Sequence, residues 1–298
     1  MASLADLVGK PEGKLSIVGT PIGNLSDASP RVISTLDTSD LVLCEDTRVT
    51  MKLMRAFHIT AKLERCDENV IASKADMVLD MLDQGLHLSF VSDAGMPGVS
   101  DPGQVLVDAA LDAGHKVEII PGPSAVTCAL AASGFNMEHF YFEGFLPRKK
   151  GAQKQRLEVL SKIPGAIVIY ESPYRVAQTL ATIAEVLDTR QVALVRELTK
   201  IHEEVVRGQA SQVAQAIGRR EAVKGECVIV ISAPSALELK ETQERLETSA
   251  TEALSLEEAI EQGLGQGRPK SALARSLARE YNLERSAVYD KIQQIARG

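Results

Sequence analysis

The sequence predicts an α/β protein with two α/β domains and a helical tail, and three observations support this. Short apolar runs without polar alternation recur through the first 235 residues, which is typical of strands covered on both faces. Segments with helical spacing separate these runs, and strand–helix alternation favours a parallel sheet. Helical periodicity resumes after an acidic stretch near residue 254. A length of 298 residues also exceeds one ordinary domain.

The first α/β domain is predicted over residues 14–122, after a flexible N-terminus at 1–13. Its expected strands are 15–18, 41–44, 88–92 and 117–120. Ser29 is a predicted helix N-cap because Pro30 follows it at the first helical position. A second helical pattern begins near Val70 and should end at Gly85.

The second α/β domain is predicted over residues 123–235. Its expected strands are 140–145, 167–170, 192–195 and 227–231, and its expected helices are 151–162 and 173–187. Residues 236–254 hold five Glu against one Lys and one Arg and lack an apolar stripe, which indicates an acidic linker. A helical tail is expected over residues 255–298.

The overall composition argues against several classes of protein. A net charge of −7 and a pI near 5.4 are not those of a protein coated in basic charge for nucleic acid. The N-terminus lacks a signal-peptide core, and no apolar run approaches the ~20 residues of a membrane helix. The four cysteines are scattered and the five histidines lack metal-site spacing. We therefore expect a cytoplasmic protein without a metal.

Three Gly/Pro-rich loops follow predicted strands of the first domain, at residues 19–24, 92–98 and 121–125. The carboxyl ends of parallel strands share one edge of a sheet, where ligands bind. Glycine lets the main chain approach a ligand, and proline stiffens the turn. None of the loops has a dinucleotide-binding or Walker A spacing, so spacing does not name the ligand. The alternative interpretation is three tight strand–helix turns.

Eight motifs occur in a characteristic order along residues 14–231. They are GTPIGNL, LCEDTR, VSDAGMPGVSDPG, PGPSA, FEGFLPRKKG, YESPYR, RELTK and KGECVIV. Together they resemble the tetrapyrrole-methylase superfamily, and most closely its branch that 2′-O-methylates a cytidine of small-subunit (16S) ribosomal RNA. The resemblance implies S-adenosylmethionine in a cleft between two α/β domains. It also implies a homodimer, no metal, and small-subunit ribosomal RNA or the 30S subunit as partner.

The resemblance also implies which residues contact the cofactor. From the first domain they are Pro21, Asp93, Ala94, Gly95, Ser124 and Ala125, and from the second Tyr170, Glu171, Thr199, Gly225 and Glu226. Two positions depart from the usual pattern of the superfamily. Met96 stands where members usually carry Thr, and residues 65–69 replace a His-rich segment, which excludes a general-base histidine there.

Charged residues after two predicted strands are candidates for catalysis. Ribose methylation requires in-line attack on the sulfonium methyl and loss of a hydroxyl proton, which a positioned base accelerates. The candidates are Glu45, Asp46 and Arg48 in LCEDTR, and Glu197 and Lys200 in RELTK. One hypothesis places Glu45 or Asp46 at the substrate, with Arg48 holding a phosphate. The alternative is a local salt bridge with helix capping.

Two basic segments are candidates for RNA contact. Residues 147–156 contain five positive charges and no acid, and their predicted contacts are Arg148, Lys149, Lys150 and Lys154. In the tail, Ala278, Asn282 and Val288 have helix-turn-helix spacing, with a second helix from 285 to 296 that displays Arg285 and Lys291. The alternatives are a solvated helix start and a hairpin that packs on the dimer.

Two other functions remain open from the sequence. A methyltransferase of the same superfamily acting on a tetrapyrrole, corrinoid or diphthine precursor would explain the three loops but not the basic segments. A non-catalytic helix-turn-helix protein that binds nucleic acid would explain the tail but not the two α/β domains.

Overall fold

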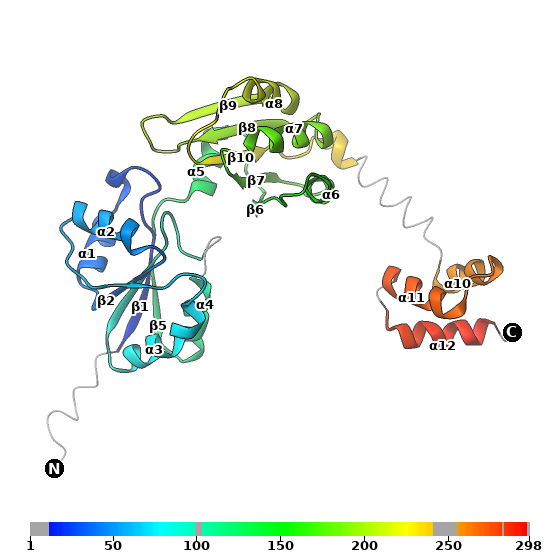
Figure 1. The fold of residues 1–298 in the computed structure, drawn as a ribbon, viewed down its shortest axis with the longest axis horizontal. Helices are drawn as coiled ribbons and strands as arrows, with labels where there is room; N and C mark the ends of the chain where they lie inside the picture. Colours follow the sequence, from blue (N-terminus) through cyan, green and yellow to red (C-terminus); the bar gives the residue numbers. More distant parts are fainter. Residues whose placement is uncertain (1–11, 99–102, 241–254, 282, 297–298) are drawn as a thin grey trace, which may run out of the picture. The chain divides into compact units, whose positions relative to one another are not determined.

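The computed structural model describes residues 12–98, 103–240, 255–281 and 283–296. The chain divides into two compact units, Met1–Pro234 and Ser235–Gly298. The larger unit contains two five-stranded sheets, and the smaller one contains helices (Figure 1). This is the α/β architecture with a helical tail that the sequence predicts. Two predicted segments lie largely outside the described residues. They are the N-terminal segment 1–13, of which 1–11 are not described, and the linker 236–254, of which 241–254 are not described.

The first sheet is entirely parallel. Its strands are β1 (Lys14–Val18), β2 (Leu41–Cys44), β3 (Leu63–Arg65), β4 (His87–Val91) and β5 (Lys116–Ile120), in the order β3-β2-β4-β1-β5. Helices α3 (Ile71–Asp83) and α4 (Gln104–Asp112) pack on one face, and α1 (Pro30–Asp37) and α2 (Thr47–Ala56) on the other. Burial on both faces explains the apolar runs without alternation.

Local sequence signals set the helix boundaries in this half. The hydroxyl of Ser29 accepts the N–H of Val32 at 3.3 Å, and Pro30 begins α1, as predicted. Gly85 follows α3 with a φ of +84°, a left-handed conformation that glycine adopts without a Cβ clash. Strand β3 was not predicted because its three residues are only partly buried or exposed, so no apolar run marks it.

The second sheet is mixed rather than parallel. Its strands are β6 (Phe140–Phe145), β7 (Ala166–Glu171), β8 (Gln191–Arg196), β9 (Glu204–Gln209) and β10 (Cys227–Ile231), in the order β6-β7-β10-β8-β9. Only β6 and β7 pair in parallel, and the other pairs are antiparallel. Strand β9 was not predicted, because it is an edge strand with no fully buried residue and therefore carries no continuous apolar run.

Four helices cover this sheet. Helices α6 (Lys150–Leu160), α7 (Val176–Val186) and α8 (Ala210–Gly218) pack on one face, and α5 (Ala125–Ser133) packs on the other. The larger unit has two halves, one built on each sheet. Because α5 packs on the second sheet, the first half ends after β5 and the second half begins at α5. The loop 121–125 therefore connects the two halves.

The smaller unit contains α10 (Leu256–Gly265), α11 (Lys270–Glu280) and α12 (Arg285–Ile295) around a shared apolar core. The side chain of Ser255 accepts the N–H of Glu258, which returns a bond to the N–H of Ser255 and so caps α10. Ser235 and Glu238 form the same reciprocal pair, and residues 236–240 are helical rather than irregular. Asn282, the predicted turn residue, lies outside the described residues.

None of the described helices combines the length and the apolarity needed to cross a membrane. Among the described residues, no three or more His, Cys, Asp and Glu side chains gather as a metal site would require.

Candidate functional site

The three Gly/Pro-rich loops of the first sheet lie in direct contact. Strands β1 and β4 are neighbours, and the loops after them form a two-bond bridge between Thr20 and Gly95, at 2.9 and 3.1 Å. The loop after β5 packs on the loop after β1, since a Cβ on Gly122 would lie 2.6 Å from the carbonyl carbon of Gly19. The structure confirms that the loops gather at the carboxyl edge of the sheet.

Gly95 and Met96 shape the loop after β4, one through its backbone conformation and the other through its side chain. Gly95 has a φ of +84°, so a side chain there would strain the loop. Met96, where the superfamily usually carries Thr, accepts the N–H of Gly122 through Sδ at 3.2 Å. Its sulfur therefore links the loops after β4 and β5.

A second group of loops gathers at one edge of the other sheet. Because β10 is antiparallel to its neighbours, its first residue, Cys227, pairs with Glu171 at the end of β7 and Arg196 at the end of β8. The loop after β8 contains two non-glycine residues with left-handed backbone, Glu197 at φ 53° and Thr199 at φ 65°. Such strain is typical of functional sites when surrounding contacts maintain it.

Three charged side chains maintain this strained loop. The ammonium of Lys200 donates to Oε1 of Glu197 at 2.8 Å and to Oε2 of Glu226 at 3.0 Å. The N–H of Glu226 also donates to Glu197, at 3.0 Å. Partial burial of the ammonium would lower the pKa of Lys200, but the two carboxylates raise it above its usual value. Lys200 is therefore a fixed cation.

The two groups of loops meet around one cavity. A Cβ on Gly23 would lie 2.9 Å from Oγ1 of Thr199, so the loop after β1 touches the loop after β8. A cavity of about 400 Å³ lies beside this contact. Its walls come from both halves of the larger unit and are mostly apolar. They are Ile22, Ala94, Ala125, Phe145, Tyr170, Glu171, Ser172, Pro173, Glu226, Cys227 and Val228.

The wall of the cavity at the end of β7 is held rigidly. Tyr170 packs edge-on against Phe142 and Phe145, with ring centroids 4.8 and 5.9 Å apart. Burial raises the pKa of the Tyr170 phenol. The buried carboxylate of Glu171 accepts from the hydroxyl of Thr179 at 2.6 Å and from the N–H of Ser172 at 2.8 Å. Glu171 therefore orders this wall through hydrogen bonds within the protein.

Two buried hydroxyls in the loops after β1 and β8 lack hydrogen-bond partners among the described residues. They are Oγ1 of Thr20 and Oγ1 of Thr199. A buried polar group without a partner costs about 1–3 kcal/mol, which calls for a ligand or water. Ser124 is the N-cap residue of α5, but its side chain makes no capping bond.

Not all of the predicted cofactor contacts line the same cavity. Ala94, Ala125, Tyr170, Glu171 and Glu226 line the 400 Å³ cavity. Pro21 and Asp93 line a neighbouring cavity of about 210 Å³. Burial raises the pKa of the Asp93 carboxyl. Ile22, Phe145, Cys227 and Val228 also line the 400 Å³ cavity, and Thr20 also lines the 210 Å³ cavity, although none of them is among the predicted contacts.

Comparison with known proteins decides the family. The sequence pattern described as Tetrapyrrole (Corrin/Porphyrin) Methylases matches residues 14–214. The chain belongs to this family. Solved structures support the fold: the methyltransferase CobJ superposes with a TM-score of 0.56 at 20% identity, over 74% of this chain and 94% of that one. A uroporphyrin-III C-methyl transferase from Thermus thermophilus, complexed with S-adenyl homocysteine, gives 0.54 at 15% identity, over 74% and 97%.

Curated relatives in this family are more similar in sequence. A protein of Thermotoga maritima named ribosomal RNA small subunit methyltransferase I is 44% identical over 74% of this chain and 98% of its own length. The protein of the same name from Bacillus subtilis is 36% identical over 93% of each chain. The second match spans the helical tail as well as both sheets.

The predicted catalytic residues of this methylase lie at two separate places. Asp46 caps α2 through the N–H of Arg48 at 2.8 Å, and its carboxylate binds the guanidinium of Arg48 at 2.6 Å. Hydrogen bonds from Arg48 lower the pKa of Asp46 to about 2. The N–H of Asp46 donates to Oδ1 of Asp93, and the N–H of Asp93 donates to Oε1 of Glu45. These contacts are those of the alternative interpretation, a local salt bridge with helix capping.

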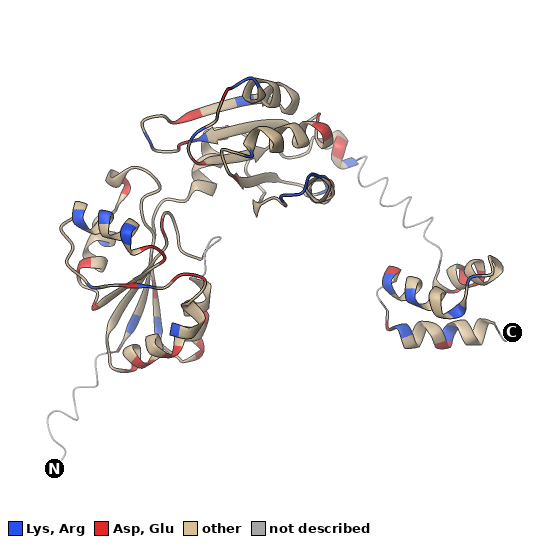
Figure 2. Ribbon diagram, viewed as in Figure 1, with Lys and Arg blue, Asp and Glu red and all other residues tan. Residues whose placement is uncertain are grey.

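The basic segment before α6 is partly neutralised within the methylase. Lys150 and Lys154 both pair with Glu185, and they lower its pKa to about 2. Arg148 and Lys149 are exposed and have no ion pair with any described residue. Figure 2 shows the basic residues gathered at the start of α6. Arg148 and Lys149 are therefore the cations of this segment that remain available to a phosphate.

In the tail, the observed helix α12 matches the predicted second helix to within one residue. Lys291 on this helix pairs with Glu257 of α10 at 2.8 Å, so its charge is partly neutralised. Arg285 begins α12 at an exposed position. Arg275 and Arg279 of α11 are further exposed cations, and neither is among the predicted RNA contacts.

Proposed function

We propose that this methylase transfers a methyl group from S-adenosylmethionine to small-subunit (16S) ribosomal RNA, at the 2′-oxygen of a cytidine. One observation carries the proposal: the loops of both halves close on a single cavity in a chain whose relatives, matched over 93% of each chain, are named as ribosomal RNA methyltransferases. The 2′-oxygen and the cytidine come from the resemblance of the eight motifs.

The residues around the 400 Å³ cavity suit S-adenosylmethionine. Its volume falls within the roughly 300–1,000 Å³ of small-molecule sites. Apolar walls at Ile22 and Ala125 suit an adenine ring. Outside these walls, in the loop that contacts Gly23, the buried hydroxyl of Thr199 lacks a polar partner among the described residues. The carboxylate of Glu226 on the wall complements a positive ligand. When bound, the cofactor supplies an electrophilic methyl on a sulfonium.

The protein contributes mainly position and charge to this reaction. Rigid loops that hold the reacting atoms in line can account for ~7–11 kcal/mol of the barrier. A carboxylate with a pKa near 2 is a weak base, so Asp46 is a poor proton acceptor. Lys200 remains protonated, so its proposed role is to hold an anionic group or to fix the loop 197–200. Arg48 is paired with Asp46 through Nε and Nη2, but its side chain is exposed, so its remaining N–H donors can contact a phosphate.

The proposed partner is RNA, bound by cations outside the cavity. Arg148 and Lys149 are available near the end of β6, the strand whose last residue, Phe145, lines the cavity. Contacts with phosphates position RNA without reading its sequence. We further propose that the methylase acts as a homodimer without a metal, as the resemblance implies.

Calorimetric titration with S-adenosylmethionine tests the cavity as the cofactor site. Ala125→Phe inserts a ring into the cavity and should weaken binding by at least about tenfold. Ala131→Phe is the matched control, because Ala131 lies exposed on the same helix, α5. Equal affinities of the two variants and the unmodified protein would contradict the cavity assignment. No binding to any of them would favour the non-catalytic alternative.

A further inference from the structure

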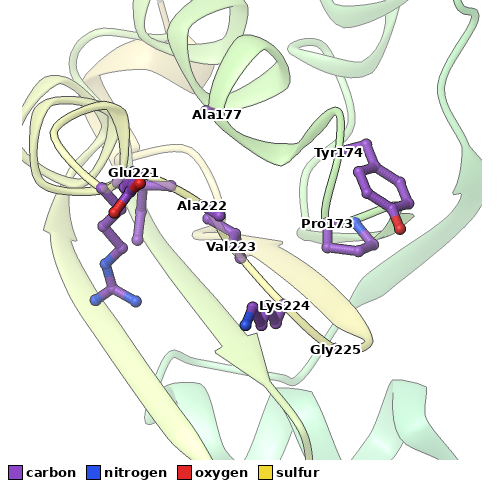
Figure 3. A pocket seen from close by; sticks show the side chains of 10 residues that line it. Pro173, Tyr174, Ala177, Glu221, Ala222, Val223, Lys224 and Gly225 are labelled. Carbon is purple, nitrogen blue, oxygen red and sulfur yellow. The ribbon is translucent and has the colours of Figure 1, made fainter.

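Apart from the 210 Å³ cavity, another cavity lies beside the proposed cofactor cavity, and we call it the second cavity. It encloses about 540 Å³ between the start of α7, the end of α8 and the loop that leads into β10. Pro173 lines both cavities, and Gly225 in the second is followed directly by Glu226 in the first. The two cavities are therefore adjacent along two stretches of chain. In Figure 3, Tyr174 lies at one side of the cavity and Glu221 at the other.

Three polar side chains around this cavity have no hydrogen bond or ion pair with any described residue. They are the phenol of Tyr174, the carboxylate of Glu221 and the ammonium of Lys224. Tyr174 is 94% exposed, although its ring is large and apolar. Ala177 and Ile217 complete an apolar wall.

The main chain around these groups is, by contrast, firmly held. Glu204 binds the guanidinium of Arg220 at 2.7 and 2.8 Å and that of Arg196 at 3.0 Å. Arg196 in turn donates to the carbonyl of Lys224 at 2.9 Å. The backbone that carries Glu221 and Lys224 is therefore fixed, whereas their charged ends are left for a ligand.

We propose that this second cavity binds the base of the nucleotide to be methylated and selects cytosine. The proposal rests on the proposed function. A base presents a flat face that stacks on tyrosine and an edge that carboxylates and ammonium groups read. The N4 amine of cytosine donates to a carboxylate, as Glu221 provides, and Lys224 donates to the O2 carbonyl. Uracil presents a carbonyl where cytosine has the amine, so it meets Glu221 unfavourably.

The position of the cavity fits this occupant. A base taken out of its stack and held in the second cavity places its ribose toward Pro173, the wall shared with the cofactor cavity. Arg220 also lines the cavity, but its guanidinium is paired with Glu204. The remaining charges, one negative on Glu221 and one positive on Lys224, match a polar, uncharged base better than a multiply charged ligand. The phosphates of the RNA would remain outside.

Methyl transfer to 30S subunits that lack the modification tests the stacking role. Tyr174→Ala should raise KM for the subunits by roughly 5- to 150-fold, the range of a lost base–aromatic stack, while Tyr174→Phe should stay near the unmodified protein. Leu111→Ala, an exposed apolar residue on α4, is the control. Affinity for S-adenosylmethionine should not change. An unchanged KM in Tyr174→Ala would overturn the assignment. So would a raised KM if sedimentation showed that the substitution dissociates the homodimer.

The ratio of methyl transfer to C and to U tests the role of Glu221, because a loss of folded protein lowers both rates equally. Reconstituted 30S subunits with C or U at the methylated position should show about tenfold or greater preference for C, and Glu221→Gln should reduce that preference. Glu158→Gln, an exposed acid on α6, is the control. A full preference for C in Glu221→Gln would overturn this inference but leave the proposed function intact. No transfer by the unmodified protein to either subunit would contradict the proposed function itself.

Discussion

Gly23 and Thr199 come from different halves of the larger unit and lie in contact. A Cβ on Gly23 would approach Oγ1 of Thr199 to 2.9 Å and Cγ of Lys200 to 2.6 Å, closer than real Cβ contacts allow. This contact brings the loop after β1 against the strained loop after β8. Beside it lies the cavity that we assign to the cofactor.

Gly23→Ala should therefore disturb the cofactor site without touching its walls. The added methyl must displace Thr199 or Lys200, and we expect S-adenosylmethionine affinity to fall about tenfold by calorimetry. Gly151→Ala is the matched control, because a Cβ there meets nothing within 4 Å and alanine favours the helix. Equal affinity of both variants would show that the contact does not shape the site.

Thr199→Val distinguishes a ligand contact from an incidental buried hydroxyl. Valine has nearly the same shape and the same β-branching, so the left-handed backbone strain at φ 65° is retained. Removal of a buried hydroxyl without a partner should stabilise the unliganded protein by about 1 kcal/mol in chemical denaturation. Affinity for S-adenosylmethionine should fall in the same variant. A stabilised variant with unchanged affinity would remove Thr199 from the site.

The ion pairs of Glu204 should make the stability of the folded protein fall at low pH. Hydrogen bonds from Arg220 lower the pKa of Glu204 from 4.5 to about 2, with Arg196 contributing further. Because the folded pKa lies below the unfolded one, the stabilisation is complete above about pH 4.5 and is lost as the pH falls toward 2. Thermal unfolding of Glu204→Gln should therefore change less across that range than unfolding of the unmodified protein. Parallel profiles would contradict this assignment.

Arg148 and Lys149 should contribute to RNA affinity through phosphate contacts. Replacing both by alanine should weaken binding of 30S subunits and reduce the slope of log affinity against log salt by about 1 per lost contact. Lys150→Ala is the comparison, because Lys150 is already paired with Glu185 at 2.8 Å and should change less. Affinity for S-adenosylmethionine serves as the check on folding. A larger effect of Lys150→Ala would reverse this ranking.

The sequence predicts this fold well where burial is two-sided. Strands β1, β2, β4, β7, β8 and β10 are buried along most of their length, and each gives a continuous apolar run in the sequence. The more exposed strands β5 and β6 also contain short apolar runs. Strands β3 and β9 were missed because partial exposure leaves them without that signal. The antiparallel direction of β10 could not be predicted, since periodicity does not record strand direction. This direction is what brings Glu226 and Cys227 beside Glu171.

The candidate site was predictable in its loops but not in its side-chain contacts. Glycine and proline marked the three loops after parallel strands, and the structure brings them together. Sequence alone could not show that Lys150 and Lys154 share Glu185, which lies on another helix. It also could not reveal the strained backbone of Glu197 and Thr199, because neither residue type signals positive φ.

The most direct test is transfer of a labelled methyl group from S-adenosylmethionine to 30S subunits from cells that lack the modification. The RNA is then digested to nucleosides, and the labelled nucleoside is identified. We predict label in a 2′-O-methylated cytidine. Label in a base or in another nucleoside would contradict the assigned position, and cofactor binding without any labelled RNA would contradict RNA as the substrate.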